Sequence, residues 1–361
     1  MRLLFPSGIG RITVSAVVPA ESASQAPRST KRLLDVRHAL RHDGPSMDIG
    51  VGLWTMRSTA AFPASPAALY AQLADDARLA ESLEFHSLWV AEHHFWYDGW
   101  CPSPLLAASS ALSATSALRV GTGVHLLGLR DPQRVAAQLC WLAQASGGRL
   151  HHGVGLGYRN GEYDGFGISR RVRGRRMDAA LEHLQTFGDA APPTWVGGFA
   201  TAALERAGRL GLGVLLPSTL TLEQVRRSIG EARAAAAAAG RSVRIGVMKY
   251  AWPTDGSESE RTWALEVLAA FTREYAGAWF PLKGRPGFES PELLEAQVRR
   301  TADTALIGSP AQLVAELQLL AREGVELCVL HLVGDGRLPQ RYEAMRLISE
   351  AVSKPLRGVP S

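Results

Sequence analysis

The segment Glu92-His93-His94-Phe95 directly follows an apolar run at 87–91 that has the pattern of a buried strand. A histidine at a strand end can act as a general acid or base near neutral pH. The glutamate and two histidines also fit a metal site, but neighbouring side chains at a strand end diverge, and the i, i+4 spacing of a zinc-binding helix is missing. We therefore expect no metal here. Histidines that only hydrogen-bond to the backbone remain an open alternative to catalysis.

Two glycine-rich segments also follow apolar runs. Residues 153–158 read Gly-Val-Gly-Leu-Gly-Tyr, which is not the spacing of a dinucleotide fingerprint, and a long loop rather than a helix is expected next. Glycines here favour the close approach of a planar or phosphorylated ligand to the backbone. In residues 195–201, Trp-Val-Gly-Gly-Phe-Ala-Thr, two glycines end a strand and a helix begins directly. Free backbone N–H groups at such a helix start suit a phosphate.

An alternation of strands and helices must position these segments. From Met47 onward, eight short apolar runs alternate with amphipathic helical patterns, which predicts an α/β fold of the parallel (β/α)8 TIM-barrel type. A doubly wound open sheet is the structural alternative. The predicted strands are 48–53, 87–91, 118–124, 150–155, 194–197, 213–216, 243–250 and 325–332.

Residues 278–300 interrupt the alternation after the seventh strand. They contain several prolines and glycines and look irregular, which fits a lid-like insertion or a long surface loop. The helix before the eighth strand is expected to start at Ser309-Pro310, because serine followed by proline is a helix start signal.

The carboxyl ends of barrel strands carry the active site, so side chains there are candidates for a substrate pocket. For the tryptophans a place in the core is the alternative, since aromatic side chains at a barrel rim often pack there. The histidines have structural alternatives too, and we expect His151 and His152 to pack within their strand. The pocket candidates are Trp54, His94, Trp100, His125 and His331.

The composition is that of a soluble globular protein with enough chain for a large core. The three cysteines have neither disulfide nor metal-ligand spacing, which favours a cytoplasmic location. No run approaches the ~18 apolar residues of a membrane span. Residues 1–46 hold seven basic and three acidic side chains and so account for most of the net charge of +5. The remaining chain, from residue 47 to 361, is nearly neutral, which gives little reason to expect nucleic-acid binding.

We expect residues 1–46 to be a disordered extension. An upstream start codon would explain it, since Met47 begins a convincing strand. The barrel domain is then residues 47–361.

The motifs together resemble the bacterial luciferase-like monooxygenases over about Met47 to Ser353. The strongest part of the resemblance runs from residue 88 to 167, where the family order and spacing are kept. Later support comes from Trp195-Val-Gly197-Gly198 and Ile307-Gly308-Ser309-Pro310. The motifs of the strongest part are Trp89-Val-Ala-Glu92-His93-His94-Phe95, Leu118-Arg-Val-Gly121-Thr122-Gly123, Arg130-Asp131-Pro132, Ser146-Gly147-Gly148-Arg149, residues 153–158, Glu162-Tyr163 and Phe166-Gly167.

This resemblance implies a TIM barrel, often a homodimer, that uses reduced FMN supplied by a separate flavin reductase. In the family, dioxygen forms a C4a-hydroperoxide on the flavin, and one oxygen atom goes to a small-molecule substrate. The first histidine of the Glu-His-His motif is catalytic there, which assigns proton transfer and stabilisation of the flavin–oxygen intermediate to His93. A non-prolyl cis peptide commonly lies under the flavin ring, here Gly123–Val124. The resemblance and the glycine-rich segments give these cofactor-binding candidates: Gly123, Val124, Gly155, Tyr158, Gly197, Gly198, Phe199, Ala200 and Thr201.

One position departs from the family pattern. Leu156 stands where many relatives have an arginine for the flavin phosphate. Loss of a charge-assisted contact weakens flavin binding unless Arg159 or another basic residue substitutes. The region 278–300 also looks shorter than the mobile loop of luciferase, so light emission is not expected.

We predict a flavin-dependent monooxygenase of a small organic molecule. The alanine- and arginine-rich composition suits a high-GC bacterium, where tailoring of secondary metabolites is one setting. The alternatives are a deazaflavin-dependent hydride-transfer oxidoreductase and a non-catalytic flavin-binding barrel. The substrate itself stays open.

Overall fold

The computed structural model describes residues 45–58, 63–95, 100–279, 290–334 and 340–356. The predicted extension therefore lies, for residues 1–44, outside the described residues. Met47 is buried, and its N–H donates to the carbonyl of Leu356 at 3.1 Å. The first strand, which begins directly after Met47, therefore belongs to the folded body of the protein.

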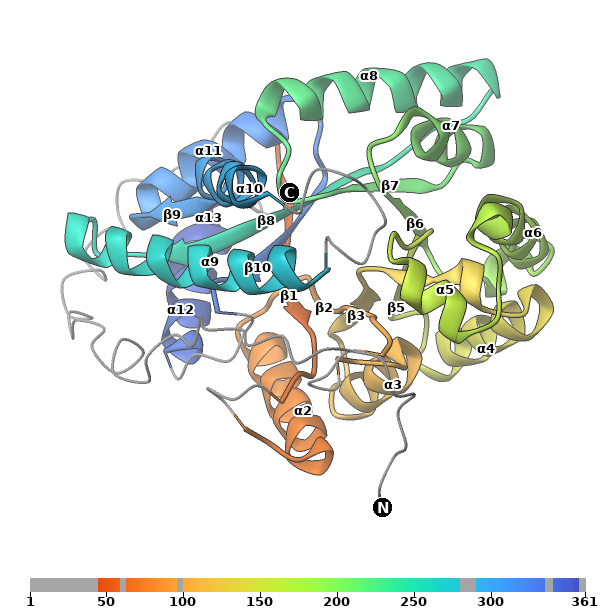
Figure 1. Ribbon diagram of the computed structural model, residues 1–361, viewed down its shortest axis with the longest axis horizontal. Coiled ribbons are helices and arrows are strands. Elements are labelled where there is room, and N and C mark those ends of the chain that lie inside the picture. Colours follow the sequence, from red (N-terminus) through yellow and green to blue (C-terminus); the bar gives the residue numbers. More distant parts are fainter. Residues whose placement is uncertain (1–44, 59–62, 96–99, 280–289, 335–339, 357–361) are drawn as a thin grey trace.

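Eight parallel strands close into a barrel (Figure 1). The last barrel strand, β10 (Leu327–Leu332), pairs with both β1 (Asp48–Trp54) and β8 (Ile245–Pro253), which closes the ring and rules out the open-sheet alternative. Two short strands lie off the ring: β4 (His125–Leu126) pairs with β5, and β9 (Leu306–Gly308) pairs with β8. The strands between β1 and β8 are β2 (Ser87–Val90), β3 (Arg119–Thr122), β5 (Leu150–Gly155), β6 (Thr194–Gly197) and β7 (Gly213–Leu216).

Helices surround the barrel (Figure 1), and several begin at the residues that the sequence marks. The Ser65 and Ser309 side chains each accept a backbone N–H at the start of a helix whose first residue is proline. The longer helices are α2 (Pro66–Ser82), α3 (Pro104–Ser113), α4 (Pro132–Ala145), α6 (Arg173–Gln185), α7 (Thr201–Leu210), α8 (Leu222–Ala238), α9 (Glu258–Trp279), α10 (Pro291–Asp303), α11 (Pro310–Arg322) and α12 (Arg341–Ile348). The short ones are α5 (Asn160–Gly165) and α13 (Lys354–Leu356).

The interior of the barrel is filled by two tryptophans, Trp89 and Trp195. Glycines on the neighbouring strands make room for them: a Cβ at Gly121 would lie 2.4 Å from the Trp89 ring, and one at Gly213 would lie 2.5 Å from the Trp195 ring. Met248 packs against this inner core and keeps partial solvent exposure. The inner core is therefore dense, and solvent reaches it at Met248.

Three local predictions were wrong. Residues 291–300 were expected to be irregular, but they are the first part of α10, which Ser290 caps. The signal, a serine followed by Pro291, was the same one that marked the other helix starts. The loop after β5 contains the short helix α5, and β3 ends at Thr122 rather than continuing to 124. Residues 280–289 lie outside the described residues.

None of the helices in the described part of the chain has the length and apolarity that a membrane-spanning segment requires.

Candidate active site

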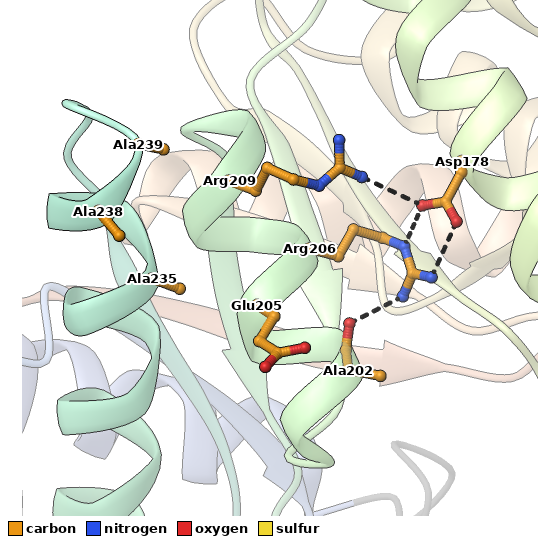
Figure 2. A pocket seen from close by; sticks show the side chains of 8 residues that line it. All are labelled: Asp178, Ala202, Glu205, Arg206, Arg209, Ala235, Ala238 and Ala239. Atoms are coloured by element: carbon orange, nitrogen blue, oxygen red, sulfur yellow. Dashed lines mark hydrogen bonds and ion pairs between the residues drawn. The ribbon is translucent and has the colours of Figure 1, made fainter.

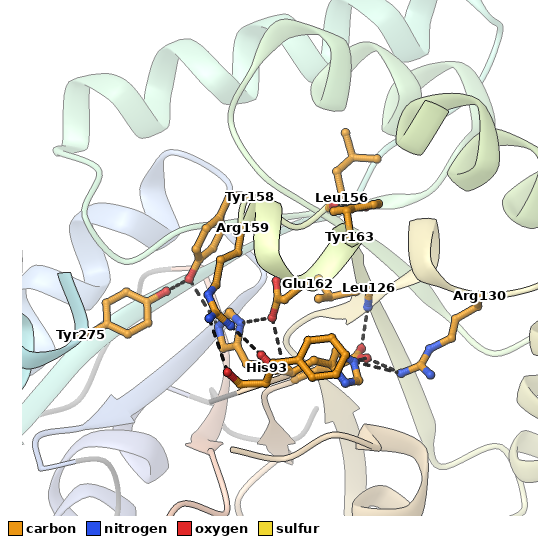
Figure 3. Close-up of polar contacts among 12 residues, drawn as sticks. His93, Leu126, Arg130, Leu156, Tyr158, Arg159, Glu162, Tyr163 and Tyr275 are labelled. Atoms are coloured by element: carbon orange, nitrogen blue, oxygen red, sulfur yellow. Dashed lines mark hydrogen bonds and ion pairs between the residues drawn. The ribbon is translucent and has the colours of Figure 1, made fainter. Parts of the chain in front are cut away.

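His93 stands just beyond the carboxyl end of β2 and is held by contacts at both ring nitrogens (Figure 3). Its Nδ1 lies 3.0 Å from Glu162 Oε1, and its Nε2 lies 3.4 Å from the hydroxyl of Tyr158. A carboxylate only accepts hydrogen bonds, so Nδ1 carries the hydrogen and Nε2 is the nitrogen turned toward Tyr158. The backbone N–H of His93 donates to the carbonyl of Cys101 at 3.1 Å, which fixes the loop. This arrangement orients one basic nitrogen in a defined direction.

Glu162 is a candidate functional residue that sequence reasoning missed, although it belongs to a motif of the family resemblance. It is fully buried on α5, and its Oε1 also accepts the backbone N–H of His94 at 3.0 Å. Among the described residues, its second oxygen has no hydrogen-bond partner. The hydroxyl of Tyr163, also fully buried, donates to the carbonyl of Leu156 and holds α5 in place. The sequence signal was the Glu162-Tyr163 motif of the family resemblance, to which no role was assigned.

The second histidine of the pair points to a different carboxylate. His94 Nε2 donates to Glu92 Oε1 at 2.5 Å, and Arg130 contacts the same oxygen. Glu92 Oε2 accepts the backbone N–H of Leu126 at 2.7 Å (Figure 3). Burial raises the pKa of Glu92, but the hydrogen bond from His94 and the electrostatic effects of His125 and Arg130 outweigh it and hold that pKa at about 2. An ionised Glu92 thus anchors His94 away from His93.

Aromatic side chains enclose the ring of His93. Trp100 meets it edge-on, with ring centroids 4.7 Å apart, and the hydroxyl of Tyr275 contacts that of Tyr158. Arg57 lies over Trp100 at 4.8 Å and pairs with Glu274 at 2.5 Å. These contacts join the loop after β1 and helix α9 to the His93 loop, so three separate segments meet around one imidazole.

The other predicted pocket residues have different surroundings. Trp54 donates from Nε1 to Asp76 Oδ2 on α2 at 2.7 Å, on the helix side of β1. His125 is buried with its Nδ1 3.3 Å from His152 Nε2, and burial lowers its pKa to about 4. His331 stacks on Tyr250 at 4.6 Å, facing the barrel mouth. The structure therefore brings together His93, Trp100 and Tyr158, and it does not bring Trp54 or His94 to them.

The residues expected to hold a flavin ring meet at Val124. The peptide bond Gly123–Val124 is cis, as expected from the family resemblance. A Cβ at Gly155 would lie 2.4 Å from Val124 Cγ2, and one at Gly197 would lie 2.5 Å from Val124 Cγ1. These two glycines therefore make room for Val124 rather than directly for a ligand. Val124 itself remains partly exposed.

The turn expected to hold a phosphate has an open helix start. Helix α7 begins at Thr201 after Ala200, which supplies no side-chain cap, whereas the Ser65 side chain caps α2. Gly198 has a φ of +140°, a conformation that favours glycine. An uncapped start leaves backbone N–H groups for an anion.

Arg159 does not contribute to this candidate phosphate-binding turn. That side chain is buried and donates to the carbonyl of His94 at 2.6 Å (Figure 3). Burial lowers its pKa. Arg159 therefore supports the His93 loop and does not replace the arginine that Leu156 displaces.

A separate hollow of about 510 Å³ lies outside the barrel, between α6, α7 and α8 (Figure 2). Within it Asp178 pairs with Arg206 at 2.6 Å and with Arg209 at 3.7 Å, and alanines of α8 form the opposite side. Asp178 and the two arginines pair with one another, and His93 does not line the hollow. The hollow therefore has no part in the chemistry of the barrel mouth. Within the described ranges, no group of three or more metal-binding side chains occurs.

The model of the luciferase-like monooxygenase family matches residues 49–327. The chain belongs to the luciferase-like monooxygenase family. Curated relatives of this luciferase-like chain include the uncharacterized protein y4vJ of Sinorhizobium fredii, 30% identical over 47% of this chain and 56% of that protein. Another is the oxygenase component of the flavin-dependent trigonelline monooxygenase of Acinetobacter baylyi, 24% identical over 59% of this chain and 66% of that one. The matches to the first relatives span about half of their length or less.

Solved structures agree with the fold of this luciferase-like chain. The oxygenating constituent of 3,6-diketocamphane monooxygenase from Pseudomonas putida, in complex with FMN, has a TM-score of 0.71 and 17% identity, covering 88% of this chain and all of that one. An F420-dependent secondary alcohol dehydrogenase has a TM-score of 0.68 and 17% identity, covering 86% and 99%. At these identities the likeness shows the barrel alone.

Proposed function

We propose that this luciferase-like chain is a reduced-FMN-dependent monooxygenase of a small organic substrate. The observation that carries the proposal is the His93–Glu162 pair, which directs one imidazole nitrogen into the aromatic enclosure at the carboxyl end of β2. Active sites of such barrels lie at this end. A histidine oriented by a carboxylate is suited to hold or move a proton there.

The residues present fit FMN. Val124 is partly exposed beside the cis peptide and would face the ring system, with Gly155, Gly197 and Tyr158 around it. The uncapped start of α7 would receive the phosphate through Gly198, Phe199, Ala200 and Thr201. Bound reduced FMN would supply the two electrons with which one atom of dioxygen enters the substrate and the other leaves as water.

The chain itself supplies proton control and a closed site. His93 Nε2 would hold or deliver a proton at the reacting oxygen, while Glu162 fixes the orientation of the ring. Trp100 and Tyr275 limit water around that nitrogen, and the Arg57–Glu274 pair fastens α9 to the loop after β1. Exclusion of water protects reduced species from unproductive reaction.

A separate flavin reductase would provide the reduced FMN, since the trigonelline relative is named an oxygenase component. The buried, unpaired thiols of Cys101, Cys140 and Cys328 suit the reducing cytoplasm, where we place the enzyme.

We further propose a homodimer joined through α3 and α4. Leu106 on α3 and Trp141 on α4 are 60% and 77% exposed to solvent, which is a high exposed fraction for large apolar residues. Trp141→Lys is expected to yield a monomer in light scattering after size-exclusion chromatography, and Phe187→Lys, on a different surface, is the matched control. A Trp141→Lys variant that keeps the wild-type mass would move the interface elsewhere, and a monomeric wild type would rule the dimer out.

The decisive experiment for the function mixes reduced FMN, the full chain and dioxygen, and follows the release of hydrogen peroxide. Free reduced FMN releases peroxide at once, and a monooxygenase that retains the oxygen delays this release. We expect His93→Ala to shorten the delay by about 10²-fold, since a positioned acid or base contributes about 10²–10⁴. The melting temperature and FMN affinity should stay as in the wild type. His183→Ala, a surface histidine on α6, is the control.

Different results would support the other functions. Rapid oxidation of reduced F420 by an organic acceptor without dioxygen would favour the hydride-transfer enzyme. The F420-dependent secondary alcohol dehydrogenase among the structural neighbours is the reason for testing this alternative. FMN binding without any delay in peroxide release would leave a flavin-binding barrel. A full delay in His93→Ala would remove His93 from the mechanism.

A further inference from the structure

A group of six ring-bearing side chains lines one side of the barrel mouth, and we call it the aromatic wall. Tyr250 stacks on His331 at 4.6 Å, and Phe271 meets these two rings edge-on at 6.1 and 5.9 Å. Phe271 and Tyr275 are parallel within 8°, with centroids 6.0 Å apart. Contacts of Tyr275 continue the wall to its remaining members, so that it consists of Trp100, Tyr158, Tyr250, Phe271, Tyr275 and His331.

The strand register places this wall directly above the inner core. Tyr250 and His331 are partners in the β8–β10 ladder. Each lies two residues beyond a side chain that packs against the buried tryptophans, Met248 and Val329. Since side chains alternate along a strand, Tyr250 and His331 point into the barrel as well. Tyr250, like Phe271 and Tyr275 of α9, remains partly exposed, so ring surface is open to a ligand.

Most of the aromatic wall lies on a different arc of the barrel from the proposed FMN site. Val124 and the α7 start adjoin β3, β5 and β6, whereas Tyr250 and His331 of the wall lie on β8 and β10. Tyr158, which follows β5, lies between the two sites. The ring of His93 contacts the rings of Trp100, Tyr158 and Tyr275 and so lies at the end of the wall. With FMN bound beside Val124, the rest of the aromatic wall is available to the second reactant, the organic substrate.

The polar groups at this end of the wall suit a neutral hydroxyl group. The hydroxyls of Tyr158 and Tyr275 touch each other, and His93 Nε2 lies 3.4 Å from the first. The nearby charges of Arg57 and Glu274 are paired at 2.5 Å and present little net charge to a ligand. Phenol and imidazole groups can donate to or accept from a hydroxyl, whereas an ionic substrate would need an opposite charge.

We propose that the substrate is an uncharged, planar aromatic compound that carries a hydroxyl group. This inference rests on the proposed function and specifies its second reactant. The flat rings stack on or meet the edges of Phe271 and Tyr275, and the hydroxyl binds among Tyr158, Tyr275 and His93. Aromatic pairs gain free energy beyond burial of area, so two such contacts favour an aromatic ring over a saturated one of the same skeleton by about tenfold or more.

The test measures calorimetric binding of three probes to the full chain saturated with oxidised FMN, and repeats it without FMN. The probes are 2-naphthol, its saturated counterpart trans-2-decalol, and decanal. We expect 2-naphthol to bind about tenfold more tightly than either other probe. Phe271→Leu should remove most of this preference and leave decalol binding unchanged, whereas Phe271→Tyr should keep it. Phe187→Leu, on the surface after α6, is the control.

The proposal is overturned if decalol or decanal binds as tightly as 2-naphthol, if none of the probes binds, or if Phe271→Leu weakens all of them equally. Melting temperatures of the variants separate loss of the wall from loss of folding. The peroxide-release experiment is run on the same samples. A normal delay without aromatic preference refutes the substrate class alone, and aromatic preference without a delay refutes the monooxygenase alone.

Discussion

The charge of Glu92 should account for a large share of the stability of the loop that carries His93. Glu92 is fully buried and accepts from His94, Arg130 and the backbone of Leu126. Its pKa in the folded protein is about 2, compared with an ordinary value of 4.5. At 1.36 kcal/mol per pKa unit, this difference corresponds to about 3 kcal/mol of folding free energy. We therefore expect Glu92→Gln to lower the free energy of unfolding by about 3 kcal/mol at pH 7.

The sign of the pH dependence follows from the lowered pKa. A carboxyl group whose folded pKa is depressed stabilises the native state above the unfolded pKa, and this contribution is lost as the pH falls through the folded value. Urea unfolding at pH 7, 5, 4 and 3 should therefore show a constant difference between wild type and Glu92→Gln down to about pH 4.5. Below that pH the difference should shrink steadily toward pH 2.

Glu223→Gln is the matched control, because Glu223 forms an exposed pair with Arg227, 3.6 Å away, and such pairs contribute little. If Glu92→Gln unfolds at the same urea concentration as the wild type at pH 7, the ionic network does not stabilise the fold. If the difference persists undiminished at pH 3, shape rather than charge is the cause.

Two further substitutions test the site. Glu162→Gln removes the negative charge that faces His93 Nδ1. Because a hydrogen bond to a charged group contributes about 1.5–3 kcal/mol, we expect the delay in peroxide release to shorten by about 10–100-fold at unchanged FMN affinity. An unchanged delay would show that Glu162 has only a packing role. Leu156→Arg supplies the charge that the family pattern places there, and we expect it to tighten FMN binding about tenfold in a fluorescence titration, with Leu156→Met as the uncharged control.

The barrel could be predicted from sequence because its signals are local and repeated. Each strand is a short apolar run, and helix starts such as Ser65-Pro66 and Ser309-Pro310 are marked by side chains that cap the backbone they precede. The position of His93 at a strand end followed from the same reasoning. Glu162 did not, because it lies 69 residues further along the chain in a helix of six residues, which is too short to show periodicity.

Side-chain direction was the harder problem, because small changes of register reverse it. The β1–β2 pairing shifts between Val51 and Trp54, and Trp54 lies on the helix side with Asp76. One extra residue in a strand moves the following side chain to the other face. Likewise β3 ends at Thr122 and β4 pairs separately with β5, which places His125 beside His152. Neither irregularity has a signature in residue types.

The turn after β5 connects cofactor affinity with catalysis. Leu156 offers no charge to a phosphate, and the next basic residue, Arg159, is committed to the carbonyl of His94. Arg159 therefore stabilises the His93 loop and is not available to the flavin phosphate. Under the proposed function, reduced FMN arrives from a reductase and oxidised FMN leaves after each turnover, so weak phosphate binding speeds the release of the oxidised flavin. We infer that Leu156→Arg, while binding FMN more tightly, turns over more slowly wherever flavin release limits the rate; tighter binding with faster turnover would contradict this reasoning.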